Sequence, residues 1–126
     1  KAKIKGYFPE MIVPKALAIG PKSQETFSKA YKKGVKIAFG TDAGVFDHGK
    51  NGEEFGYMVE AGMPAIETIQ SATLTNASVL GVSDELGQIS VGFIADIVAT
   101  NDDPTKDIST MANIVFVMKE GKVYKQ

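Results

Sequence analysis

The chain has 126 residues and a net charge of −1, with 44% hydrophobic and 23% charged residues. This composition is typical of a soluble globular protein of one domain or slightly more. Cysteine and arginine are both absent, which excludes disulfides, thiolate zinc sites and bidentate guanidinium clamps.

The charge is unevenly distributed along the chain. Residues 1–50 contain ten lysines and four acids, whereas residues 51–126 contain four lysines and eleven acids. We expect two solvated faces that attract each other, and no nucleic-acid partner, because the lysines are scattered. No leader precedes an apolar stretch and no run of 18 apolar residues occurs, so we expect no membrane partner. A start at lysine suggests a proteolytic product or a partial chain.

The N-terminal third predicts a connection followed by a helix. Residues 1–22 contain three prolines and weak periodicity, which favours a segment that runs over the surface, with at most a short helix at 15–19. Residues 23–33 predict a helix that Ser23 caps and Gly34 ends.

Residues 35–40, Val-Lys-Ile-Ala-Phe-Gly, predict a buried strand, and Gly-Thr-Asp-Ala-Gly follows at 40–44. An α/β barrel places its catalytic carboxylates just past strand ends. Asp42 therefore has two interpretations. It is a metal ligand that doubles as a general base, or it caps the following turn.

His48 is the only histidine and lies in a glycine-flanked loop at residues 45–52. A loop of this composition suits a binding segment. His48 therefore contacts substrate, binds a metal ion or faces solvent, and the residues leave these three possibilities open.

Helices are predicted next, and strands after them. Residues 53–61 predict a helix and Pro64 starts another, which we expect to break near 73–75 because threonines bond to local backbone. A short helix at 76–80 should end at Gly81.

The C-terminal third predicts short strands. Their expected ranges are 87–90, 94–100, 114–119 and 122–125, with a hairpin turn at Glu120 and Gly121. Asp96 interrupts an apolar strand, so we expect its carboxylate to bond a turn or neighbouring backbone and to be structural.

Several motifs in this order resemble the C-terminal part of the amidohydrolase superfamily. The closest branch is similar to the metal-dependent Xaa-Pro dipeptidase and imidazolonepropionase-like group. The motifs are Gly-Thr-Asp-Ala-Gly at 40–44, His-Gly at 48–49, Met-Val-Glu-Ala-Gly-Met-Pro at 58–64, Ser-Ala-Thr at 71–73, Asn-Ala-Ser at 76–78, Leu-Gly-Gln-Ile at 86–89, Ala-Asp-Ile-Val at 95–98, and Val-Met-Lys-Glu-Gly-Lys-Val at 117–123.

The resemblance implies an α/β fold that is the last βα portion of a TIM-like (β/α)8 barrel plus a small C-terminal β-subdomain. Residues 1–85 would form the barrel part, with strand 8 at about 35–40, and residues 86–126 the β-subdomain. Asp42 would match the Asp after strand 8, a metal ligand and proton shuttle, in an enzyme with one or two zinc ions.

The same resemblance implies that most of the site lies elsewhere. The family's His-x-His, its metal-bridging carboxylated lysine, its two further histidines and seven of its eight strands would all lie upstream of residue 1. We therefore expect the remainder of its own polypeptide as a partner. We also expect a homo-oligomer, because unpaired strand edges and an uncovered apolar helix face favour association.

The sequence thus predicts the C-terminal segment of a zinc-dependent amidohydrolase that cleaves a peptide (Xaa-Pro or related dipeptide) amide bond. Asp42 would be the base and a metal ligand, and His48 would bind the small peptide or amide substrate. A cyclic amide or imidazolone-type hydrolase is the alternative within the superfamily. A non-catalytic structural or interaction module is the alternative from another class. The chain alone should bind zinc weakly and hydrolyse nothing.

Overall fold

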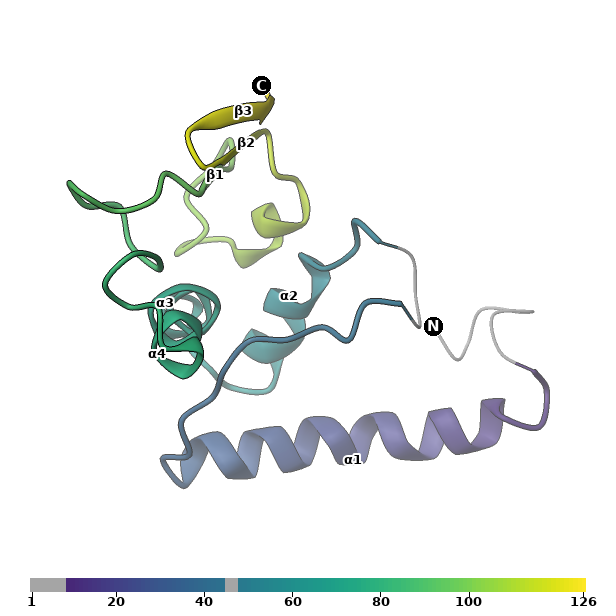
Figure 1. Ribbon diagram of the computed structural model, residues 1–126. Coiled ribbons are helices and arrows are strands. Elements are labelled where there is room, and N and C mark those ends of the chain that lie inside the picture. The colour runs from purple at the N-terminus through teal and green to yellow at the C-terminus, as the bar shows by residue number, and fades with distance from the viewer. Residues whose placement is uncertain (1–8, 45–47) are drawn as a thin grey trace.

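The computed structural model describes residues 9–44 and 48–126, and Figure 1 shows their arrangement. The long helix α1 and a three-stranded sheet lie at opposite ends, with the shorter helices between them. The elements are α1 (Val13–Lys32), α2 (Glu53–Glu60), α3 (Ala65–Gln70), the π-helical turn η1 (Ser71–Thr75), α4 (Asn76–Leu80), β1 (Ile97–Ala99), the 3-10 helix η2 (Ile108–Ala112), β2 (Phe116–Lys119) and β3 (Lys122–Lys125).

Helix α1 begins ten residues earlier than the sequence predicted, and it runs through Pro21. Residues 13–22 of the expected surface connection therefore belong to the same helix as the predicted helix at 23–33, and Ser23 lies inside it rather than at its cap. Residues 1–8 of that connection lie outside the described residues. No residue of α1 is buried. Water can therefore reach the backbone carbonyl that Pro21 leaves without a donor, which lowers the cost of a proline at this place.

Residues 35–40, predicted as a strand, belong to no sheet of the described chain. Their backbone bonds instead to the helical stretch formed by η1 and α4. Phe39 N lies 3.2 Å from the carbonyl oxygen of Ser71 and 3.1 Å from the Asn76 side chain. A strand is stabilised by the ladder of a neighbouring strand. No strand lies beside this segment in the described part of the chain, so residues 35–40 are not a strand of the described chain, and their place as the last barrel strand stays a prediction.

A small core lies between α2 and the helices after it. Phe55 and Met58 face inward from α2, and the Phe55 ring stacks on Phe39 with ring centroids 4.4 Å apart. The buried hydrophobic residues are Phe55, Met58, Ala61, Met63 and Ala77. Ile66 of α3 does not join this core, because its side chain is 50% exposed. The core of the described chain is thus small, and the segment at 35–40 packs against it through the ring of Phe39.

The helical stretch after Pro64 changes its winding where the threonines stand. Residues Ser71–Thr75 form a π-helical turn between α3 and α4, and the Thr73 hydroxyl donates to the carbonyl oxygen of Ile69 over 2.9 Å. The predicted break is therefore confirmed as an irregular turn. Gly81 ends α4 in the left-handed region with φ of 73°, also as predicted.

The C-terminal sheet is antiparallel in the order β1-β2-β3. Glu120 and Gly121 form the predicted hairpin turn, with φ of 51° and 77°, the signs that a type I′ turn requires. The predicted strand at 87–90 is wrong. Gly87 has φ of 98° and approaches Ala77 so closely that a Cβ would need neighbouring atoms to shift, and an extended strand does not allow this conformation.

The division of the chain at residues 85 and 86 stays a prediction. The parts on either side touch where Gly52 packs against the backbone of Met111 in η2, so closely that an added Cβ would overlap the Met111 carbonyl. In the part of the chain that the structure describes, no helix is both long and apolar enough to cross a bilayer.

Candidate functional site

Asp42 is exposed and has a left-handed backbone, with φ of 49°. Aspartate tolerates this region better than most residues, and such conformations gather at functional sites. Among the described residues, no hydrogen bond or ion pair engages its carboxylate. The turn-cap interpretation requires a bond from a following backbone amide, and the described residues provide none. The carboxylate is therefore available to a partner outside this part of the chain.

Asn76 fixes the backbone three residues before Asp42. Its Nδ2 donates to the carbonyl oxygen of Phe39 over 2.9 Å, and its Oδ1 accepts from Phe39 N over 3.1 Å. One side-chain amide thereby bonds both polar groups of a residue, as a neighbouring strand would. The end of the segment at 35–40 is held from α4, and Asp42 is presented just beyond it.

His48 is exposed, and residues 45–47 between it and Asp42 lie outside the described residues. The structure nevertheless links the two predicted site residues through their neighbours. Asn51 Nδ2 donates to Thr41 Oγ1 over 2.8 Å, and Asn51 Oδ1 accepts from Gly49 N over 3.3 Å. Thr41 precedes Asp42 and Gly49 follows His48, so one amide lies within hydrogen-bond distance of both neighbours.

Asp42 can supply a ligand to a divalent metal ion. The Asp42 carboxylate is of the right chemistry, because it is an ionisable oxygen donor that no described group engages. No group of three or more His, Cys, Asp or Glu side chains that could hold an ion occurs within residues 9–44 and 48–126. Asp42 therefore fits as one member of a metal site whose other ligands come from elsewhere.

Asp96 shows the opposite arrangement, as the sequence predicted. Its Oδ1 accepts from the backbone amide of Glu120 over 2.7 Å, and its Oδ2 lies 3.5 Å from Lys119 Nζ. Glu120 and Asp96 together raise the pKa of Lys119 above its usual value, because both carboxylates favour the ammonium form. Asp96 ties the start of β1 to the hairpin turn and is structural.

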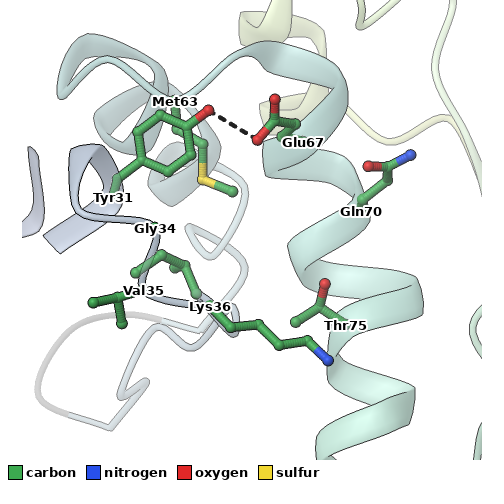
Figure 2. A pocket seen from close by; sticks show the side chains of 9 residues that line it. Tyr31, Gly34, Val35, Lys36, Met63, Glu67, Gln70 and Thr75 are labelled. Carbon is green, nitrogen blue, oxygen red and sulfur yellow. Dashed lines mark hydrogen bonds between the residues drawn. The ribbon is translucent and has the colours of Figure 1, made fainter.

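Figure 2 shows a pocket at the start of the segment that leads to Asp42. The Tyr31 hydroxyl donates to Glu67 Oε2 over 2.8 Å, which raises the pKa of Tyr31 because the carboxylate accepts from the neutral phenol. Neither Asp42 nor His48 lines the pocket. The residues that line it are Tyr31, Gly34, Val35, Lys36, Ile37, Met63, Glu67, Gln70 and Thr75.

Asn51 and Asn76 build the site, but their positions in the sequence do not identify them as site residues. Asn51 looked like ordinary loop composition. Asn76 offered a signal, because asparagine is unfavourable inside helices and such a residue often bonds backbone elsewhere. The partner of that bond depends on the tertiary fold, so the sequence alone could not name Phe39.

The family model described as the amidohydrolase family matches residues 2–124. Ochratoxinase from Aspergillus niger is 32% identical over 116 residues, which cover 88% of this chain and 24% of that protein. A Xaa-Pro dipeptidase with methionine bound in its active site shares 52% identity and a TM-score of 0.89, over 99% of this chain and 31% of its own. A prolidase complexed with N-methylphosphonate-L-proline shares 29% identity and a TM-score of 0.80, over 94% and 30%. This chain spans about a quarter to a third of these proteins.

Proposed function

This chain belongs to the amidohydrolase family, and on that premise we propose that it is the C-terminal segment of a zinc-dependent enzyme that cleaves a Xaa-Pro or related dipeptide amide bond. The likeness to a Xaa-Pro dipeptidase along nearly the whole chain is the observation that supports this substrate class most strongly. The short coverage of the relatives means that the activity belongs to the complete protein.

In this proposal residues 35–40 form the last strand of a (β/α)8 barrel once the remainder of the polypeptide lies beside them. Their freedom from any sheet in the described chain fits that role. Asn76 holds one place on the segment, and other backbone groups stay available to neighbouring strands. The remainder of its own polypeptide is thus the first partner, and a homo-oligomer is the second.

Asp42 would act as a ligand of the ion and as the general base. A bound divalent ion would polarise the substrate carbonyl and lower the pKa of a water molecule toward neutrality. Asp42 would accept the proton of the attacking water on a carboxylate oxygen and deliver it to the leaving amine. An exposed carboxylate that no described group engages suits both steps, because neither oxygen has to break a bond first.

His48 would contact the substrate. Its exposure and its position directly before Gly49, which Asn51 bonds, support a place near the substrate beside Asp42. Asp42 would thus transfer the proton, and His48 would bind the substrate.

Substrate profiling of the complete protein tests the proposal. We expect hydrolysis of Xaa-Pro dipeptides, and none of it from the 126-residue chain alone. Preference for cyclic amides or imidazolones would move the assignment to the other branch of the family. A complete protein that hydrolyses neither class and shows no thermal shift with zinc would favour the non-catalytic module and contradict the proposal.

A further inference from the structure

Asn51 contacts the neighbours of both predicted site residues. Its amide donates to the Thr41 hydroxyl over 2.8 Å and accepts from the backbone amide of Gly49 over 3.3 Å. Thr41 is bonded to Asp42 and Gly49 to His48. A single side chain therefore holds together the two chain segments that present them.

Asn51 is itself well anchored. It is half-buried, and its carbonyl oxygen accepts from Glu54 N over 3.2 Å at the start of α2. The next residue, Gly52, packs against the Met111 backbone in η2 with no room for a Cβ. Asn51 thus lies at the start of α2, where η2 packs against the chain. This packing fixes the Asn51 side chain, which can therefore position Thr41 and Gly49.

We propose that Asn51 is a positioning residue that sets His48 relative to Asp42 so that substrate binds beside the base. This inference rests on the proposed function, because it takes His48 as the substrate contact. Asn76 also holds the segment before Asp42, but among the described residues its side chain bonds Phe39 alone and does not reach the segment of His48. Asn76 is therefore a matched control for Asn51. Both are side-chain amides that bond backbone groups near Asp42 or His48, but the position of His48 should not depend on Asn76.

Kinetics of the complete protein with a Xaa-Pro dipeptide separate the two asparagines. Asn51→Leu keeps the approximate shape and removes both bonds, so we expect KM to rise about tenfold and kcat to change less. In a His48→Ala background the same substitution should change KM less than about twofold, because the residue it positions is gone. Asn76→Ala should have the same effect in both backgrounds. Thr41→Val should reproduce part of the rise in KM seen in Asn51→Leu. Thr41→Ser keeps the hydroxyl and should keep KM near the wild-type value.

Exchange of the Gly49 amide proton, followed by NMR, gives a readout apart from activity. We expect about tenfold faster exchange in Asn51→Leu, and no change in Asn76→Ala. Unchanged exchange in Asn51→Leu would overturn the inference, as would a KM effect that persists undiminished without His48. If Asn51→Leu does not fold, Thr41→Val in the two backgrounds gives the same decision. An inactive wild-type protein would overturn the proposed function and this inference together, whereas an active one with additive effects overturns the inference alone.

Discussion

Asp42 and Asp96 have opposite environments. Asp96 bonds the amide of Glu120 and pairs with Lys119, so the chain itself satisfies its charge. Asp42 has no such partner among the described residues, and it stands in a left-handed conformation at the end of an unpaired segment. The chain itself satisfies the carboxylate of Asp96, whereas we propose that the carboxylate of Asp42 binds a metal ion. The predictions below test that distinction.

The largest expected effect comes from removing the charge of each carboxylate in the complete protein. Asp42→Asn should lower kcat by about a hundredfold to ten-thousandfold, because the base and one ligand are lost, and should leave the melting temperature of the metal-free protein nearly unchanged. Asp96→Asn is the matched control and should do the reverse, with kcat nearly unchanged and a small loss of stability. Steady-state kinetics and thermal unfolding of both variants measure the contrast. A near-wild-type rate for Asp42→Asn would show that its role is misassigned.

The contact between Gly52 and η2, which joins the helical part of the chain to the C-terminal part, gives the next largest effect on stability. A methyl group at Gly52 would overlap the Met111 carbonyl, so Gly52→Ala should lower the free energy of unfolding by about 1–3 kcal/mol. Gly56, also a glycine of ordinary helical φ, has no atom within 4 Å of an added Cβ. Gly56→Ala should therefore stabilise the protein by about 0.5–1 kcal/mol. Chemical denaturation compares them, and equal effects would disprove the close contact.

The clamp on the Asp42 segment should have an effect of intermediate size. Asn76→Ala removes both bonds to Phe39, each of which contributes about 1 kcal/mol, so we expect a loss of about 1–2 kcal/mol. Val79→Ala, three residues on and 63% exposed, serves as the control in the same helix. If the two variants unfold at the same denaturant concentration, the amide does not hold the segment.

The smallest effect concerns the start of the same segment. Glu67 raises the pKa of Tyr31, so Glu67→Gln should lower that pKa toward its ordinary value. The sign follows from the hydrogen bond, because the neutral phenol donates to the carboxylate. The stability from this bond is present below about pH 10 and is lost as pH rises through the raised pKa. Titration of Tyr31 by NMR in both proteins measures the shift, and an unchanged pKa would mean that the bond does not form.

Local chemistry predicted much of the C-terminal part. The hairpin at Glu120 and Gly121, the helix end at Gly81 and the structural role of Asp96 follow from residues close in sequence or from the cost of an unpaired charge. The predictions that failed depend on distant parts. The extent of α1 past Pro21 and the conformation of Gly87 are set by what packs, or does not pack, against them.

The candidate site divides in the same way. Asp42 and His48 were proposed from their positions beside a strand and among glycines, and their roles stay predictions. Asn51 and Asn76 were missed as positioning residues because their partners lie 10 and 37 residues away in sequence. Spacing along a chain does not reveal such pairs, whereas coordinates show them directly.

Hydrolysis of a Xaa-Pro dipeptide by the complete protein, before and after chelation, tests the central claim that Asp42 serves a metal-dependent amidohydrolase. We expect the wild-type activity to disappear with chelator and to return with added zinc, and the Asp42→Asn variant to stay inactive throughout. Activity that survives thorough chelation, or that zinc restores equally well in Asp42→Asn, would contradict the account.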